Sequence, residues 1–248
     1  EKYHIATEHL MQKQMKKHGL DESRFQISEK AMQKIIHEYT RESGVRALER
    51  RIASLCRKAD REILEKNRKK VQITERNLEK CLGKSIYETN MKAEHDEVGI
   101  VRGLAWTSVG GDTLEIEVNL MPGKGKFELT GQLGDVMQES AKAGISYIRS
   151  VSDDYELDPE YFQQHDIHIH IPEGAVPKDG PSAGITMATA MLSAVLNKPV
   201  RADVAMTGEI TLRGRVLPIG GLKEKLLAAK GAGMKTVIVP EKNRRDVE

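Results

Sequence analysis

One serine stands in a turn that could present a nucleophile. Residues 180–184 read Gly-Pro-Ser-Ala-Gly, which fits the G-x-S-x-G pattern of the strained turn that exposes the reactive serine of α/β-hydrolases. A hydroxyl near neutral pH attacks a carbonyl only as its proton leaves, so Ser182 needs a base within hydrogen-bond distance. The sequence therefore indicates acyl transfer and raises the question of which side chain activates Ser182.

Histidine is the usual base, but its positions do not fit the hydrolase order. All eight histidines precede Ser182, whereas the α/β-hydrolase order runs serine, acid, histidine. Other triad folds place histidine first, and His168 and His170 lie nearby in DIHIHIP. Alternation puts both on one face of an expected strand and the isoleucines on the other. An H-x-H pair can bind zinc, but no third ligand is evident, so we favour a structural or solvated pair and expect no metal site.

Lysine can also act as the base if burial disfavours its charged form. Lys223 and Lys225 follow a Gly-Gly pair in GGLKEKLLAAKG, where the expected helix is otherwise rich in leucine and alanine. Two residues apart, the lysines face nearly opposite directions, and each has apolar neighbours. A helical wheel therefore does not choose between them.

The composition is that of an ordinary soluble globular protein. The chain has 248 residues, of which 39% are hydrophobic and 31% charged, and no run approaches the roughly 18 apolar residues of a membrane span. Cys56 and Cys81 form no metal-binding spacing, which suits a reducing compartment. The chain has no initiator methionine or signal peptide and starts at Glu1 inside an expected helix, so we expect a fragment of a longer protein.

Charge and residue pattern divide the chain into two expected domains. Residues 1–88 hold 21 Lys and Arg against 14 Asp and Glu, whereas residues 89–248 hold 18 against 23. We place the linker around residues 85–98. A basic run at residues 68–70 could touch nucleic acid, but a solvated helix end is the favoured interpretation.

The first domain is predicted to be a small helical bundle. One helix ends at Gly19, a second begins after a cap at Ser28, and the longest amphipathic run spans residues 43–67. In that run apolar residues recur at helical spacing and indicate a core: Val45, Leu48, Ile52, Leu55 and Ala59. A short extended segment VQI and a capped helix in TERNLEKCLG follow.

The second domain mixes strands and helices without strict βαβ repetition, which predicts an α+β fold. Residues 114–119 alternate apolar and polar side chains, and the glycines of Gly110-Gly111-Asp112 predict the turn of a hairpin. Further expected elements are a helix in GDVMQESAKAGISYIRSV, the HIHIP strand, an apolar helix after Ser182, two strands in residues 203–221, a helix and a last strand in KTVIVP. No segment has the P-loop spacing G-x-x-x-x-G-K-[ST], so this chain should not hydrolyse ATP alone.

Several longer motifs resemble one family. PKDGPSAGITMATA and VRADVAMTGEITLRGRVLPIGGLKEKLLAAKGAGMKTVIVP are similar to the proteolytic domain of Lon, an ATP-dependent AAA+ protease family with a Ser-Lys dyad. AWTSVGGD and TGQLGDVMQES match the family upstream, and ESGVRALER resembles the small helical lid of its ATPase module. The resemblance covers nearly the whole chain. It implies a lid in residues 1–88 and a serine protease domain in residues 89–248 that is truncated at its C-terminus.

The resemblance also implies roles for single residues. Mapped by motif, the nucleophile is Ser182 and the catalytic lysine is Lys225, the second lysine of GGLKEK. Thr207 would hydrogen-bond and orient the lysine, and Asp179 would belong to a loop that switches between inactive and active forms.

Three further residues match positions with other roles in the family. Trp106 and Glu117 match positions near the substrate groove, although a lone tryptophan in a strand is more often a core residue. Arg46 matches the arginine by which such lids sense nucleotide, whose phosphate would lie on a domain absent from this chain.

At the level of the whole protein, the resemblance implies cleavage of unfolded or damaged proteins. Peptide hydrolysis itself should need no cofactor, whereas the full-length parent would use ATP and Mg and form a homo-hexamer. Weak DNA binding is a further expectation, and the compartment would be the bacterial cytoplasm or the mitochondrial matrix.

Two alternatives to a Ser-Lys protease stay open. One is a Lon-like binding or DNA-repair module that keeps the fold without proteolysis. The other is a G-x-S-x-G esterase, which the chain order already disfavours. Retention of Ser182 and Lys225 argues against the first.

Overall fold

The computed structural model describes residues 1–87, 93–107, 109–158, 160–172 and 178–247. Contacts divide the chain into two compact units, Glu1–Thr89 and Asn90–Glu248, and each has its own hydrophobic core. The predicted boundary between residues 88 and 89 lies outside the described residues. The α+β fold predicted from the sequence is confirmed. No helix among the described residues has both the length and the apolar character that a membrane span requires.

The first unit is mostly helical, with one small sheet. Its elements are α1 (Lys2–Ile5), the π-helical turn η1 (Ala6–Leu10), α2 (Met11–Lys17), β1 (Phe25–Ile27), α3 (Glu29–Glu38), α4 (Arg46–Lys66), β2 (Val71–Ile73) and α5 (Glu75–Leu82). The segment VQI forms β2, as predicted, and pairs in parallel with β1, which the sequence pattern did not reveal.

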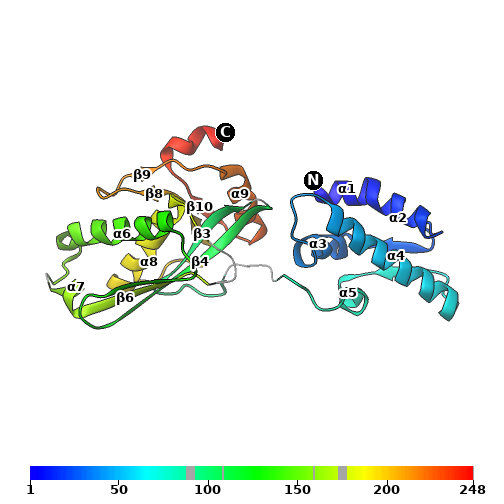
Figure 1. The fold of residues 1–248 in the computed structure, drawn as a ribbon, viewed down its shortest axis with the longest axis horizontal. Coiled ribbons are helices and arrows are strands. Elements are labelled where there is room, and N and C mark those ends of the chain that lie inside the picture. Colours follow the sequence, from blue (N-terminus) through cyan, green and yellow to red (C-terminus); the bar gives the residue numbers. More distant parts are fainter. Residues whose placement is uncertain (88–92, 108, 159, 173–177, 248) are drawn as a thin grey trace. The chain divides into compact units, whose positions relative to one another are not determined.

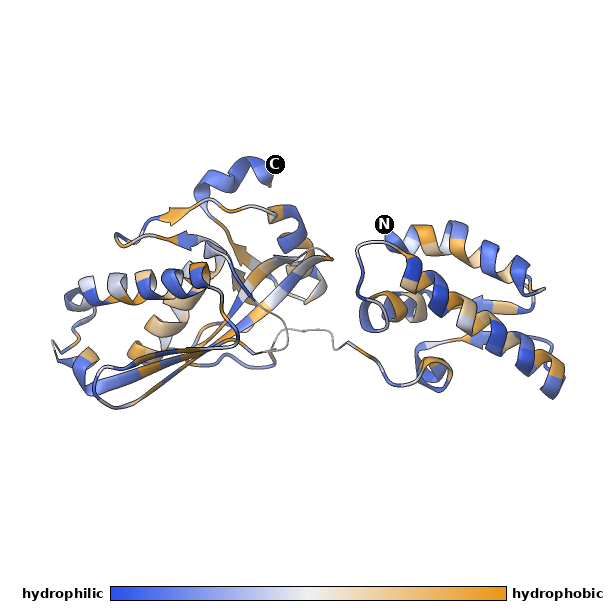
Figure 2. Ribbon diagram, viewed as in Figure 1, coloured by the Kyte–Doolittle hydropathy of each residue, from blue (hydrophilic) through white to orange (hydrophobic). Residues whose placement is uncertain are grey.

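The helices of this unit form where caps and periodicity predicted them. The Ser28 side chain accepts a hydrogen bond from the Ala31 N–H and so caps α3. On α4 the four apolar residues from Leu48 to Ala59 that carried the periodicity are all buried. Charged residues occupy most of the rest of its surface, with Leu64 as an exposed exception, and the helix therefore shows alternating colours in Figure 2.

The second unit carries the candidate site. Its elements are β3 (Ile100–Thr107), β4 (Gly110–Pro122), β5 (Phe127–Thr130), α6 (Asp135–Ser150), η2 (Ser152–Tyr155), α7 (Tyr161–Gln164), β6 (His165–His170), η3 (Pro181–Ala183), α8 (Gly184–Leu196), β7 (Val204–Met206), β8 (Glu209–Ile210), β9 (Val216–Leu217), α9 (Leu222–Gly231), β10 (Thr236–Ile238) and η4 (Glu241–Asp246). Residues 203–221 thus hold three short strands where two were predicted, because β8 and β9 form a separate hairpin (Figure 1).

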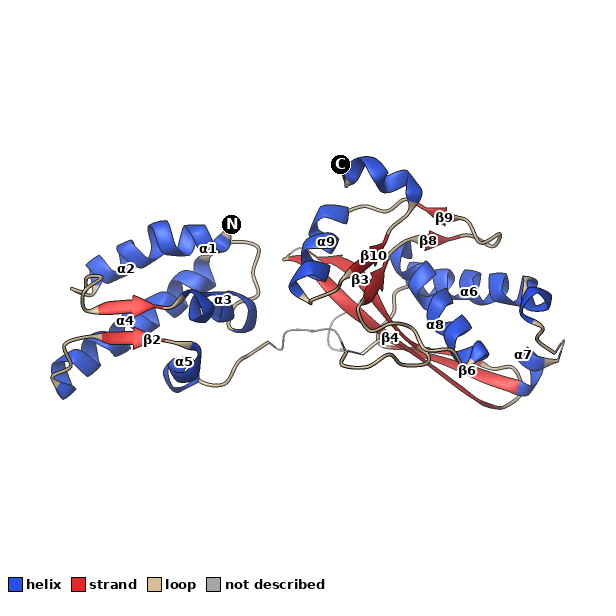
Figure 3. Ribbon diagram, turned by 180° about the vertical axis from the view of Figure 1, so that it is seen from behind, coloured by secondary structure: helices blue, strands red, loops and turns tan. Residues whose placement is uncertain are grey.

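Six strands form one mixed sheet in the order β10-β7-β3-β4-β6-β5. The β3–β4 and β4–β6 pairs are antiparallel, and the other three pairs are parallel. Figure 3 shows these strands in red, seen from behind.

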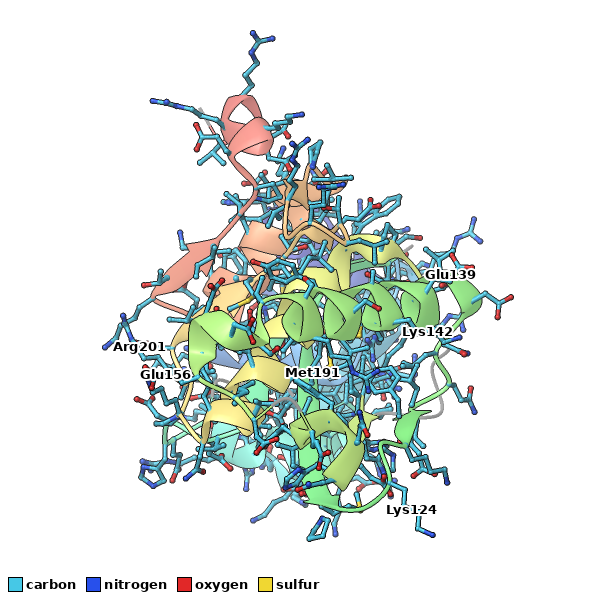
Figure 4. All side chains as sticks on the ribbon, turned by 90° about the vertical axis from the view of Figure 1, so that its left-hand side faces the viewer. Lys124, Glu139, Lys142, Glu156, Met191 and Arg201 are labelled. Carbon is cyan, nitrogen blue, oxygen red and sulfur yellow. The ribbon has the colours of Figure 1, made fainter. Side chains whose placement is uncertain are left out.

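Helices lie against both faces of this sheet. Gly103 on β3 approaches Thr186 of α8, whereas the next residue, Leu104, packs with Ala229 of α9. Since successive residues of a strand point to opposite faces, α8 and α9 cover opposite faces. The helix α6 packs on α8 through Gly144 and Met191, and Met191 is labelled in Figure 4, with Lys142 and Glu139 of α6 above it.

The predicted glycine turn is wrong. Gly110 and Gly111 are the first two residues of β4 and pair with Thr107 and Trp106. A Cβ atom on Gly111 would stand 2.0 Å from the carbonyl oxygen of Glu224 in α9. Gly111 is therefore needed because α9 packs directly on β4 at this position. Sequence periodicity alone could not distinguish a glycine required by close packing from a glycine in a turn.

Candidate active site

Ser182 lies in a tight turn that leads into a buried helix. Pro181 stands at the first position of η3, and Gly180 precedes it with a φ of 120°, a conformation that favours glycine. The following helix, α8, is buried along most of its length. The predicted helix start after Ser182 is confirmed, and the turn leaves the Ser182 side chain half-buried.

The structure distinguishes the two lysines that the helical wheel could not. Lys225 is 3% exposed, whereas Lys223 on the same helix is exposed. Burial lowers the pKa of the Lys225 ammonium group from 10.5 to about 8, because the charged form loses its hydration. The setting of Lys225 can therefore hold a neutral fraction of the amine near physiological pH.

Thr207 connects Lys225 to the serine segment. Lys225 Nζ donates a hydrogen bond to Thr207 Oγ1 at 3.1 Å, and Thr207 Oγ1 donates to the backbone carbonyl of Ser182, also at 3.1 Å. The Gly208 N–H donates to the same carbonyl at 2.8 Å. The residue that follows β7 therefore holds both the lysine head group and the backbone of the serine.

The serine hydroxyl and the lysine amine are close in the fold but not bonded. Among the described residues, no hydrogen bond joins Ser182 Oγ to Lys225 Nζ. A direct proton transfer requires such a bond, at roughly 2.6–3.2 Å between the heavy atoms. In this arrangement the lysine amine is instead hydrogen-bonded to Thr207 Oγ1.

Asp179 caps a helix from outside it. The helix α6 begins after Gly134, which has no side chain to cap it. Instead, Asp179 Oδ1 accepts a hydrogen bond from the N–H of Met137, the third residue of α6, at 3.1 Å, where a capping side chain would normally bind. The same oxygen accepts from the Gly180 N–H at 2.8 Å. The carboxylate thus ties the loop before Ser182 to α6.

Trp106 and Glu117 lie at different places on the sheet. Trp106 is 62% exposed and lies against Gly221, the residue before α9. It is therefore not a core residue, contrary to the usual position of a lone tryptophan. Glu117 is half-buried on β4 opposite His170, and no described hydrogen bond or ion pair joins it to Ser182 or Lys225.

The two histidines of β6 belong to a polar network. Their predicted alternation with buried isoleucines is confirmed. Thr130 Oγ1 lies 2.9 Å from His168 Nε2 and 2.8 Å from His170 Nδ1, and Glu128 lies 3.7 Å from His168 Nδ1. No group of three His, Cys, Asp or Glu residues that could hold a metal occurs among the residues the structure describes.

In the first unit, Arg46 lies at the edge of a basic hollow. It is the first residue of α4 and lines a pocket with Gln14, Lys17, His18, Glu49, Arg50, Ala53 and Arg57. The one carboxylate, Glu49, is already paired with Lys13 at 2.8 Å. The remaining positive charge suits a polyanionic group such as a nucleotide phosphate chain.

Sequence reasoning missed two residues that build the site. The buried Ser140 of α6 donates to the Pro181 carbonyl at 3.3 Å, and Asn243 holds the segment before α9 through Ile219. A glycine at the cap position of α6, Gly134, was the available signal for an external cap.

Two family models match this chain. Residues 16–72 match the Lon protease AAA+ ATPase lid domain, and residues 72–248 match the Lon protease (S16) C-terminal proteolytic domain. The models meet inside β2, whereas β2 pairs with β1 and belongs to the first compact unit.

Curated relatives match over the full length of the chain. It is 57% identical to a Lon protease of Lachnoclostridium phytofermentans, 56% identical to Lon protease 1 of Bacillus subtilis and 58% identical to a Lon protease of Desulforamulus reducens. The matches cover 100% of this chain and 36%, 32% and 31% of these relatives, respectively. The chain thus spans about a third of their length.

Proposed function

Because this chain belongs to the Lon protease family, we propose that its second unit is a serine endopeptidase with Ser182 as nucleophile and Lys225 as general base. The observation that carries this proposal is the buried lysine amine, which is hydrogen-bonded to Thr207 and through it to the backbone of Ser182. The apolar setting supplies the neutral amine that a base requires.

The reaction has two steps. Neutral Lys225 Nζ accepts the hydroxyl proton as Ser182 Oγ attacks the peptide carbonyl carbon. The resulting ammonium then gives its proton to the departing amine, which leaves an ester on Ser182. Water attacks that ester, Lys225 takes the water proton, and the proton returns to Ser182 as the carboxyl product departs.

Neighbouring groups prepare both steps. Thr207 accepts one N–H of the lysine, which directs the nitrogen lone pair of the neutral amine elsewhere. Pro181 stands at the first position of η3, and the backbone N–H groups of the next two residues, Ser182 and Ala183, are suited to stabilise the oxyanion.

The pH dependence of peptide cleavage tests this assignment. The pKa of Lys225 is lowered to about 8 by burial, so the neutral fraction rises as pH rises through that value. We expect kcat/KM on a fluorogenic peptide to increase about tenfold between pH 7 and pH 9, with a midpoint near the lysine pKa. A flat profile, or a midpoint in the histidine range near 6.5, would contradict a lysine base.

For Asp179 we propose the switching role. It stabilises the present turn through the cap on α6, and in this turn Ser182 is not bonded to Lys225. If the loop moves for chemistry, Met137 should lose its cap. We expect the Met137 amide to exchange hydrogen faster after Ser182 is labelled with a fluorophosphonate, as measured by hydrogen-exchange mass spectrometry. Equal protection before and after labelling would leave Asp179 a purely structural cap.

We further propose that Trp106 and Glu117 line the substrate groove. The exposure of Trp106 beside the N-terminus of α9 supports a contact with a bound peptide, and Glu117 is half-buried on β4 opposite His170. A KM for the peptide that does not change in Trp106→Ala and Glu117→Gln would argue against these roles.

In the longer protein we propose that ATP acts at the hollow next to Arg46. The cations of that hollow fit a phosphate chain, and hydrolysis by the parent would supply energy for unfolding substrates. Mg would bind together with the phosphates of the nucleotide. Loss of nucleotide-dependent casein degradation in Arg46→Ala, with peptide cleavage kept, is the expected signature.

The remaining proposals concern the whole parent. We propose unfolded or damaged proteins as substrates, a homo-hexameric assembly and a bacterial cytoplasmic location, since the relatives named above are bacterial. For DNA binding the structure offers little support, because Arg68 of the basic run already pairs with Glu62 at 3.4 Å. Cleavage of peptides by this chain would exclude the alternative of a non-proteolytic binding or DNA-repair module.

A further inference from the structure

Asn243 is a buried amide in the short C-terminal turn η4. Its side chain is 4% exposed and binds both backbone groups of one residue far away in the chain. Asn243 Oδ1 accepts from the Ile219 N–H at 2.9 Å, and Asn243 Nδ2 donates to the Ile219 carbonyl at 2.9 Å. The second Nδ2 hydrogen goes to Asp246 Oδ2 at 2.6 Å. Only an amide offers a donor and an acceptor side by side in this way.

Ile219 lies just before the helix that carries Lys225. Two residues later, Gly221 has a φ of 67° and begins α9 without any side-chain cap. The Gly221 carbonyl accepts the N–H of Lys225 at 3.1 Å. The position of Ile219 therefore determines where the first turn of α9, and with it the lysine, is placed.

The segment that leads into η4 is hydrogen-bonded to Thr207. The Thr207 N–H donates to the Ile238 carbonyl at the end of β10, and η4 starts three residues later. Thr207 is therefore linked to Lys225 in two ways. One is the direct 3.1 Å hydrogen bond between their side chains. The other runs from Thr207 along β10 to Asn243, from there to Ile219, and then into α9.

We propose that Asn243 is a positioning residue for the general base. It holds the segment before α9 so that Lys225 Nζ stays buried and within reach of Thr207 and Ser182. This inference rests on the proposed dyad. Asn243 does not touch the reacting atoms, and it acts through the backbone of Ile219 alone.

Without the two hydrogen bonds between the Asn243 amide and the Ile219 backbone, the segment before α9 can shift and admit water to Lys225. A hydrated lysine has a higher pKa than a buried one, and a misplacement of about 1 Å can reduce catalysis by up to about 100-fold. Loss of these two hydrogen bonds should therefore change the protonation of Lys225 as well as the rate, whereas simple loss of folded protein would change only the amount of active enzyme.

The test compares three variants of the 248-residue chain. Asn243→Ala removes both bonds to Ile219, and Asn243→Asp keeps the size of the side chain but replaces the donor by a second acceptor. Asp246→Asn is the matched control, because it removes a charge beside the amide and leaves both bonds to Ile219 in place. Circular dichroism establishes folding for each.

Two readouts are needed. The first is the pH profile of kcat and KM on a fluorogenic peptide. The second is a titration of Lys225 by NMR with lysine labelled at Cε, assigned with Lys225→Arg, which does not depend on activity. We expect both Asn243 variants to lower kcat about 10- to 100-fold, to leave KM within about twofold, and to raise both midpoints by about half a pH unit or more.

The possible results separate the two proposals. A wild-type chain that neither cleaves peptide nor reacts at Ser182 overturns the dyad, while the NMR titration still reports whether Asn243 controls the lysine. If the wild type is active and both Asn243 variants titrate as Asp246→Asn does, the positioning role is wrong. If both Asn243 variants unfold while the control folds, the amide is a folding residue only, and the proposal is overturned as well.

Discussion

Replacing Ser182 by alanine should reduce cleavage of a fluorogenic peptide and of casein by at least about 1,000-fold. In the proposed mechanism the acyl intermediate forms on this hydroxyl, which alanine lacks. The loss should appear in kcat rather than KM, since Ser182 makes its new bond only during the reaction. Steady-state kinetics and covalent labelling with a fluorophosphonate measure the effect.

The fold should survive this change. The contacts that hold Ser182 use its backbone carbonyl, which binds Thr207 and Gly208, and alanine keeps that carbonyl. Ser150→Ala, on the exposed C-terminal end of α6, is the matched control and should keep activity within about twofold. Residual cleavage above a few per cent in a folded Ser182→Ala protein would show that another nucleophile operates.

Replacing Lys225 by methionine should lower kcat about 100- to 10,000-fold, which is the usual contribution of a general base. Methionine fills a similar volume without a proton-accepting nitrogen, so the cavity stays occupied. Lys223→Met on the same helix is the control. Because Lys223 is exposed, we expect its loss to change kcat by less than about twofold. Equal losses in the two variants would remove the basis for choosing Lys225.

The same substitution should make the protein more stable at neutral pH. The pKa of Lys225 is lowered to about 8 in the folded state, while the unfolded value is near 10.4. Below pH 8 the folded state must charge a buried amine, so stability falls as pH drops from about 10.4 to 8. At pH 7 the free energy of unfolding is lowered by up to about 3 kcal/mol. Lys225→Met removes this cost, so we expect a higher Tm. An unchanged or lower Tm would mean that the lysine is better solvated than its burial indicates.

Local patterns in the sequence predicted most of the secondary structure and singled out Ser182 as the candidate nucleophile. The apolar spacing of residues 48–59 predicted α4, and the Ser28 cap predicted the start of α3. Pro181 and the apolar run after it predicted the helix start at Ser182. Helix starts and apolar spacing depend on residues that are close together in the sequence, so they can be predicted from the sequence alone.

Glycine shows where such local reasoning ends. Gly110 and Gly111 have the composition of a turn, yet both belong to β4, and α9 packs directly against Gly111. The absent side chain at Gly134 likewise makes room for Asp179, whose Cγ would stand 2.4 Å from a Cβ at that position. In both cases the partner is far away in the sequence, and no local pattern identifies it.

The choice of Lys225 as the proposed general base shows the same difference between what the sequence determines and what the fold determines. The sequence by itself determined that a serine stands in a tight turn and that a leucine- and alanine-rich helix carries two lysines, and a helical wheel could not separate Lys223 from Lys225. The resemblance of GGLKEK to the Lon motif singled out Lys225, and only the tertiary structure supplied a physical reason. Burial of the Lys225 amine lowers the pKa of that amine. The hydrogen bonds from Lys225 to Thr207 and from Thr207 to Ser182 join segments that lie 18 and 25 residues apart in the sequence. Protonation depends on solvent exposure, and solvent exposure is a property of the folded chain.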